Sequence, residues 1–233
     1  NIHLVIHYDP VVTDDPELQR LKERCQTLLR QQDERLTLHD FRMIQGKLHM
    51  NLVFPGISYL DERRHIATVF QSVFGGSNNS MLFQKIREEE GLAYSVFSYG
   101  CPYAKEGLVH IDAVTAPNQA ETVFEYALEV CETMRTQSVS EETLSTHKAL
   151  IRTEAILSKE SVQSRMEGNG RNVLLRGRII DREEELARIE KVTAEDIQRF
   201  ANEILCPERM SVCLVGETRS AGRRLMRKYE QLS

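Results

Sequence analysis

Arg87 and Tyr94 are the residues of this sequence whose types and spacing point most directly to chemistry. An arginine carries a fork of donors for carbonyls or carboxylates, and a tyrosine hydroxyl can donate to the oxyanion that forms in acyl transfer. Gly91, between them, is well placed to end a helix that holds Arg87 and to lead into a strand that holds Tyr94. Both side chains could then reach one cleft. Spacing alone favours a simpler interpretation, an arginine near a helix end beside a surface tyrosine.

His3 and His7, in "HLVIH", stand four residues apart, which is the spacing of two zinc ligands on one helical face. The stretch alternates as a strand does, however, and residues four apart on a strand lie about 13 Å from each other. It matches neither H-E-x-x-H nor the inverted H-x-x-E-H. The remaining histidines have no ligand-like spacing. The sequence therefore predicts that this chain binds no metal.

The stretch "GGSNNS", residues 75–80, begins like a phosphate-binding loop. It lacks the G-K-[ST] ending of a Walker loop and the pattern G-x-G-x-x-G. A helix N-terminus attracts anions, which keeps a phosphate site as an alternative. The favoured interpretation is structural, with the glycines allowing a tight turn and with Asn79 or Ser80 capping the following helix.

The composition is that of an ordinary globular protein, with 233 residues, 41% hydrophobic and 28% charged residues. A formal net charge of -5 argues against a nucleic-acid partner. No apolar run reaches the roughly 18 residues that span a bilayer. Five widely spaced cysteines form no C-x-x-C pair, so a reducing compartment is the default expectation. The cytoplasm is therefore favoured, and a periplasmic location would follow if a longer parent chain carried a signal peptide.

The elements that must position Arg87 and Tyr94 begin with strands. Residues 2–6 alternate as a strand, residues 16–29 follow a helical pattern, and a polar linker is expected at 30–40. In "KLHMNLVF" the apolar residues again share one face of a strand that Pro55 and Gly56 end: Leu48, Met50, Leu52 and Phe54.

Around Arg87 and Tyr94 the pattern predicts a helix at 59–74, a second helix near 80–90 and a strand from about Leu92. "GLVHIDAVTA" is expected to return as the antiparallel partner of that strand.

Further along the chain, apolar residues at helical spacing predict a helix at 118–136. Ser140, followed by two glutamates, is a good N-cap for a long helix that runs towards Met166. "GNGRN" at 168–172 is expected to break that helix before a short apolar piece at 173–175.

The C-terminal part shows a capping box, in which Thr193 and Asp196 start a helix at 194–204. Pro207 should stop this helix before the final strand "MSVCLV", and the basic tail can form a terminal helix. Strands followed by paired helices predict an α+β fold, with helices packed on a mostly antiparallel sheet.

The stretch "FGGSNNSMLFQKIREEEGLAYSVFSY" closely resembles the C-terminal, non-catalytic domain of the pitrilysin-type (M16) zinc peptidases. "NLVFPG", "SKESVQSRMEGNGRNVLLRGR", "KVTAEDIQRFANEIL" and "MSVCLVGE" are also similar to that domain, and the resemblance covers roughly residues 45–217. It implies the α+β fold of M16 peptidases and LuxS-like metallohydrolases. It also implies three parts: an end of the preceding domain or an extension at 1–35, the C-terminal-type domain at 36–217, and a basic tail at 218–233.

In that family a first domain holds zinc through H-x-x-E-H and a downstream glutamate, and the metal activates water. The second domain reaches across with an arginine and a tyrosine seven residues apart, which bind substrate near the scissile bond. By resemblance these are Arg87 and Tyr94. Met81 departs from the arginine that relatives often carry before "LF". Without H-x-x-E-H, the chain is expected to be no enzyme on its own and to bind no cofactor, the zinc belonging to a partner catalytic domain.

The implied partners are therefore a catalytic M16 domain, in the same parent chain or in another subunit, and peptide substrates. Two alternatives stay open from the sequence. The chain can be a peptidase-like scaffold subunit without catalytic activity, as some family members in respiratory complexes are. It can also be an independent ligand-binding α+β domain, which tight binding of a nucleotide or phosphate would indicate.

Overall fold

The computed structural model describes residues 47–158, 160–216 and 219–230, together with short parts of 20–31. The chain divides into two compact units, 1–46 and 47–233. In the first unit, the described residues between Arg20 and Gln31 are helical, in agreement with the predicted helix. The predicted opening strand, most of the polar linker and the domain boundary at residue 35 lie outside the described residues.

The second unit contains an antiparallel sheet with the strand order β2-β3-β1-β4, which confirms the predicted fold class. β3 pairs with both β1 and β2, so the predicted partner of the strand that carries Tyr94 is confirmed. The apolar face predicted for β1 is buried, because Leu48, Met50, Leu52 and Phe54 are at most 1% exposed. The strands are β1 Leu48–Gly56, β2 Ala93–Pro102, β3 Gly107–Thr115 and β4 Ser211–Gly216.

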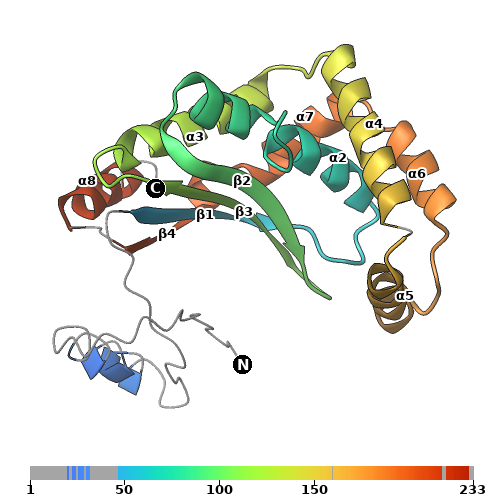
Figure 1. The fold of residues 1–233 in the computed structure, drawn as a ribbon, viewed down its shortest axis with the longest axis horizontal. Helices are drawn as coiled ribbons and strands as arrows, with labels where there is room; N and C mark the ends of the chain where they lie inside the picture. The colour runs from blue at the N-terminus through green and yellow to red at the C-terminus, as the bar shows by residue number, and fades with distance from the viewer. Residues whose placement is uncertain are drawn as a thin grey trace. The chain divides into compact units, whose positions relative to one another are not determined.

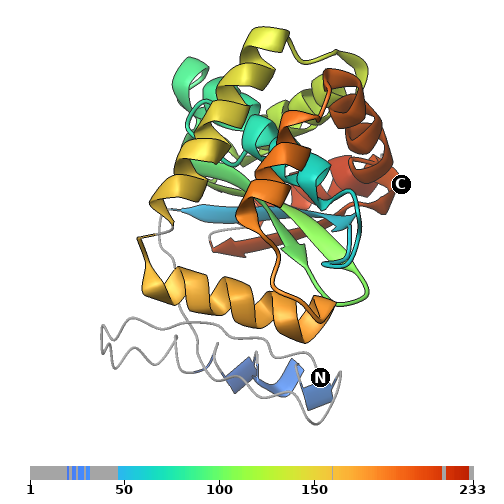
Figure 2. The same cartoon turned by 90° about the vertical axis from the view of Figure 1, so that its right-hand side faces the viewer.

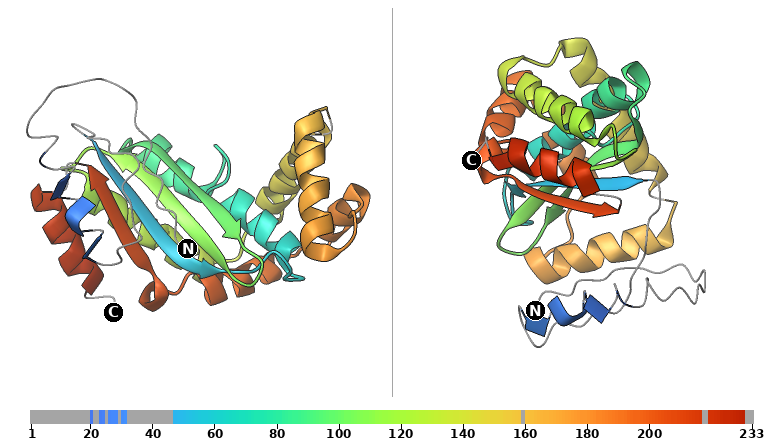
Figure 3. Two further views of the ribbon diagram at one scale, coloured as in Figure 1. Left: turned by 90° about the horizontal axis from the view of Figure 1, so that it is seen from below. Right: turned by 90° about the vertical axis from the view of Figure 1, so that its left-hand side faces the viewer.

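Helices cover one face of this sheet, and the described elements of the second unit leave its other face without a helix (Figure 1; Figure 3, left). The helices are α2 Arg64–Phe74, the π-type helix η1 Phe83–Glu89, α3 Ala120–Thr136, α4 Glu141–Leu157, α5 Val162–Arg176, α6 Arg182–Glu190, α7 Ala194–Ile204, the short 3-10 turn η2 Pro207–Arg209 and α8 Arg219–Glu230. Within these described ranges, none is both long and apolar enough to cross a membrane.

The core lies between the sheet and the helices, and an aromatic cluster joins α2 to α7. Phe70 is fully buried, and its ring centroid lies 5.2 Å from those of Phe74 and Phe200. Packed aromatic rings add about 0.5–1.5 kcal/mol per pair to the stabilisation from burial. The cluster therefore stabilises the helix layer. After the end of α2 the chain passes through Gly75 and continues into η1.

Two predicted helix starts are confirmed by their caps. The Ser140 side chain accepts a hydrogen bond from the Thr143 N–H at the start of α4. At α7, the Thr193 side chain accepts from the Asp196 N–H, and the Asp196 carboxylate accepts from the Thr193 N–H, which completes the predicted capping box. The helix predicted at 59–74 begins later, at Arg64.

The long helix predicted from Ser140 towards Met166 is wrong, since α4 ends at Leu157 and α5 is a separate helix. The Ser161 side chain accepts a hydrogen bond from the Ser164 N–H and so starts α5. Figure 2 shows α5 running across the ends of α4 and α6.

The predicted break at 168–172 is also wrong, because α5 continues through Gly168 and Gly170. A glycine inside a helix costs about 1 kcal/mol, which weakens a helix without ending it. The terminator is Gly177, whose φ of 72° is left-handed. The residues at 173–175 are therefore helical.

Candidate functional site

Arg87 is carried by η1, which is fixed at its inner side by the fully buried Ile86. The Leu92 N–H donates to the Ile86 carbonyl at 3.0 Å, and Gly91 turns the chain with a φ of 63°. The Thr115 hydroxyl of β3 then donates to the Leu92 carbonyl at 2.6 Å. These bonds hold the helix end against the strand start, as the sequence predicted for Gly91, and we call this segment the η1–β2 junction (residues 86–94).

The Arg87 side chain is exposed, and its guanidinium carbon lies 4.9 Å from the centre of the Phe83 ring. Two of the neighbouring acids are engaged elsewhere, because Lys85 pairs with Glu89 at 3.5 Å and with Glu90 at 3.2 Å. Among the residues that the structure describes, no carboxylate forms an ion pair with Arg87. Its donors are therefore available to an external carbonyl or carboxylate.

Tyr94 owes its exposure to a β-bulge. Regular alternation along β2 would aim it to the same side as Val96 and Ser98, which are 2% and 3% exposed. The register shifts between Ala93 and Ser95, so Tyr94 is an extra residue that the ladder leaves unpaired. Its side chain is 73% exposed as a result. A bulge in this position keeps a large polar-tipped ring out of the core and presents it at the surface.

Lys47 lies close to Tyr94, with its Nζ 3.9 Å from the ring centre. An ammonium over a tyrosine ring is attracted by the π electrons and restrains the ring. The structure thus places Arg87 at the end of η1 and Tyr94 at the start of β2, both exposed and both at one junction. That the two side chains share one substrate cleft stays a prediction.

The family described as "Peptidase M16 inactive domain" matches residues 18–151, which is more than half of the chain. This chain belongs to the M16 peptidase family. The "Uncharacterized zinc protease YmxG" of Bacillus subtilis is 33% identical over 156 residues, covering 67% of this chain and 38% of that protein. The chain therefore spans less than half of this relative's length.

Solved structures share the fold. A peptidase M16 inactive domain from Pseudomonas fluorescens matches with a TM-score of 0.66 and 19% identity, over 73% of this chain and 41% of that one. A chain of complex III2 from Candida albicans matches with a TM-score of 0.69 and 14% identity, over 82% of this chain and 48% of that one. At these identities the likeness concerns the fold alone, and it agrees with the α+β architecture predicted from the sequence.

The described part of this M16 domain contains no group of three or more histidine, cysteine, aspartate or glutamate side chains that could hold a metal ion. His3 and His7 lie outside the described residues. His147 is 1% exposed, and its Nδ1 lies 2.9 Å from the Ser72 hydroxyl. Burial lowers the pKa of His147, which keeps it neutral inside the helix layer.

The "GGSNNS" loop makes a close contact with the sheet. The Ser98 N–H of β2 donates to the Gly75 carbonyl at 2.9 Å, and a Cβ on Gly75 would lie only 2.4 Å from that of Ser98. Glycine is therefore required here by space. The predicted cap is wrong, because η1 has no side-chain cap and the Ser80 hydroxyl donates to the Ser77 carbonyl at 2.5 Å. Ser80 is fully buried and serves the turn instead.

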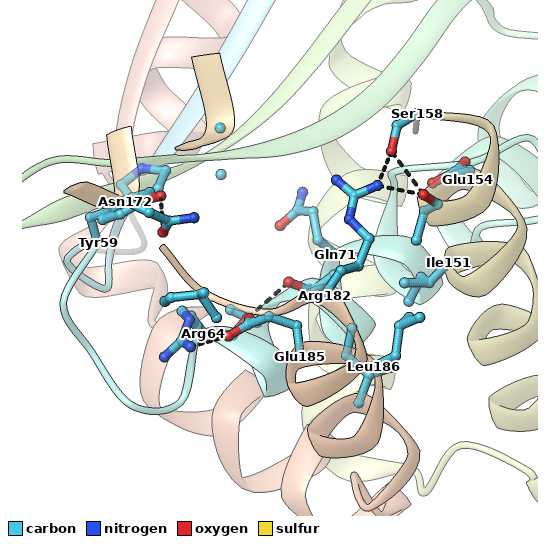
Figure 4. A pocket seen from close by; sticks show the side chains of 18 of the residues that line it. Tyr59, Arg64, Gln71, Ile151, Glu154, Ser158, Asn172, Arg182, Glu185 and Leu186 are labelled. Atoms are coloured by element: carbon cyan, nitrogen blue, oxygen red, sulfur yellow. Dashed lines mark hydrogen bonds and ion pairs between the residues drawn. The ribbon is translucent and has the colours of Figure 1, made fainter. Parts of the chain in front are cut away.

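A large pocket that the sequence did not predict lies elsewhere in the domain, with a volume of about 1280 Å³ (Figure 4). Arg87 and Tyr94, both described, are not among its lining residues. Its walls come from many separate segments, so no local spacing could indicate it. We call it the α5 pocket, and its lining comes from residues 57–59, α2, Gly76, 100–102, 108–109, the end of α4 with Ser158, α5, 179–181, α6 and Phe200.

Proposed function

We propose that this chain is the non-catalytic domain of a zinc-dependent M16-type metallopeptidase, contributing substrate binding and transition-state stabilisation to a zinc site in another domain or subunit. The family match and the relatives named as zinc proteases support this proposal. The observation that carries it is the η1–β2 junction, where a bulge exposes Tyr94 and where Arg87, seven residues earlier, is exposed and has no ion-pair partner in the described chain.

The two side chains have separable roles in this proposal. Arg87 donates hydrogen bonds to a carbonyl of the bound peptide and so fixes its position. When water adds to the scissile carbonyl, negative charge develops on the carbonyl oxygen, and the Tyr94 hydroxyl donates a hydrogen bond to it. The metal, when bound in the partner domain, supplies the activated water. The substrate is a peptide, and its sequence preference would depend largely on the catalytic half.

The test is Tyr94→Phe in the full-length protein or complex that contains the catalytic half. Loss of one oxyanion donor typically lowers the rate about a hundredfold, so kcat/KM for a reporter peptide should fall by that factor. Tyr103→Phe is the matched control, because this tyrosine is also exposed, at 57%, and follows the other end of β2. Unchanged kcat/KM in Tyr94→Phe would rule out the proposed role of this hydroxyl.

A second candidate is a peptidase-like scaffold subunit without catalytic activity. The fold that this chain shares with a chain of complex III2 from Candida albicans supports this second candidate. The two candidates differ in whether H-x-x-E-H occurs in the parent chain or in a partner subunit. Its absence from both would favour the scaffold, and its presence would favour the peptidase.

A further inference from the structure

The α5 pocket lies between α5 and the rest of the domain, against which α5 packs loosely. None of the α5 side chains, all of which the structure describes, is buried. The helix is held at its C-terminal end by Tyr59, whose hydroxyl donates to the Asn172 side-chain oxygen at 3.1 Å. Arg176 donates to the Tyr59 carbonyl at 2.9 Å and lies 4.4 Å over the Tyr59 ring. Tyr59 thus anchors the C-terminal end of α5, and Figure 4 shows its contact with Asn172 at the edge of the pocket.

The pocket is lined by four arginines and three carboxylates, of which Arg165, Glu154 and Asp181 are exposed. The half-buried ones are Arg64, Arg176, Arg182 and Glu185, and Glu185 pairs with Arg64. Arg182 donates to neutral oxygens, the Ala155 carbonyl and the Ser158 hydroxyl.

Arg176 likewise binds a neutral carbonyl, and burial together with the nearby charge of Arg64 lowers the pKa of Arg176. Two guanidinium groups therefore lack a carboxylate partner among the described residues. An anionic ligand would supply one, with charge-assisted hydrogen bonds.

The floor of the pocket is apolar. Ile151, Leu186, Ile189 and Phe200 line it and are at most 8% exposed. The volume of about 1280 Å³ exceeds the roughly 300–1,000 Å³ of small-molecule sites. An apolar ligand longer than a typical small molecule fits such a space.

The edge strand β2 borders the same pocket at Gly100. The Ser98 N–H points away from β3, since it donates to the Gly75 carbonyl. Alternation places the N–H and C=O of Gly100, two residues later, on the same outer edge. No described backbone group bonds to Gly100 there, and glycine has no side chain to obstruct the approach. An extended backbone can add to an edge of this kind, as in β-augmentation.

We propose that the α5 pocket binds the C-terminal end of an extended, apolar peptide. The terminal carboxylate pairs with Arg176, the apolar side chains pack on the floor, and the peptide backbone bonds to the edge at Gly100. Neither Arg87 nor Tyr94 takes part, and no catalytic domain is needed. The proposal therefore stands or fails independently of the proposed function.

The test is fluorescence anisotropy with this chain and a short, N-terminally labelled peptide of alanine, leucine and valine. Free carboxylate and C-terminal amide forms are compared, and decanoate is the competitor. Losing a hydrogen-bonded charge should weaken binding of the amide about tenfold or more. Equal affinity of the two forms, or no saturable binding, would overturn the proposal. Decanoate displacing the peptide at equal concentration would also overturn it, by identifying a site for small carboxylic acids.

A matched pair of variants locates the site. A Cβ on Gly168 or on Gly170 would meet no atom within 4 Å, so both positions of α5 accept larger side chains. Gly168 lines the pocket and Gly170 does not. Gly168→Leu should fill the pocket and weaken peptide binding about tenfold or more, whereas Gly170→Leu should stay within about twofold of the parent chain. Equal binding by the two variants would place the peptide elsewhere. If Gly168→Leu misfolds, the comparison of the free carboxylate and amide peptides on the parent chain still tests the proposal.

Discussion

At the η1–β2 junction the fully buried Ile86 and a backbone hydrogen bond to Leu92 fix the chain, whereas α5 has no buried side chain and is anchored through Tyr59. The first arrangement sets exposed side chains in a fixed place, as contact with a reacting centre requires. The second leaves a wall that can adjust to its ligand, because few buried contacts mean low local stability. The two proposals therefore assign chemistry to the region that is held in place and ligand capture to the region that is loosely held.

The largest expected effect comes from truncating the buried anchor of the η1–β2 junction, and it tests the contrast between the junction and α5. Ile86→Ala removes a fully buried side chain and should lower the free energy of unfolding by about 2–5 kcal/mol in urea titrations. Leu174→Ala in α5 is the control, since Leu174 is 85% exposed and its loss should cost less than about 0.5 kcal/mol. Similar losses in both variants would show that α5 is packed as firmly as the junction.

Replacing a glycine with alanine should lower stability at the η1–β2 junction and raise it in α5. Gly91 has a φ of 63°, and a left-handed alanine costs about 1–2 kcal/mol, so Gly91→Ala should lower the free energy of unfolding by that amount. Gly168 lies inside a helix with no atom near its missing Cβ, so Gly168→Ala should raise the helix stability by up to about 1 kcal/mol. Urea titration and helical circular dichroism measure the two effects. A stabilising Gly91→Ala would contradict the role given to this turn.

The sequence predicted the regions that local patterns determine. Alternation identified the buried face of β1, and the Thr193–Asp196 capping box identified the start of α7. The helix break predicted at 168–172 was wrong, because a glycine lowers helix propensity but does not by itself impose a positive φ. In this helix the positive φ occurs at Gly177.

At the candidate site, too, the local features were predictable and the long-range ones were not. Arg87 and Tyr94 were found from spacing and resemblance, but the bulge that exposes Tyr94 depends on the register with β3. The α5 pocket was missed entirely, because residues as far apart as Tyr59, Arg182 and Phe200 line it. Such long-range pairings leave no periodic signal in a single sequence.

The smallest expected effect tests the anchor of α5. Tyr59→Phe keeps the ring under Arg176 and removes the hydroxyl that donates to Asn172, so the global free energy of unfolding should change by less than about 1.5 kcal/mol. Amide hydrogen exchange should nevertheless become faster throughout α5, because a loosely held helix opens locally. The amides of η1 are the internal control and should keep their rates. Unchanged exchange in α5 would mean that other contacts hold the helix, and faster exchange in both regions would mean that the domain opens as one unit.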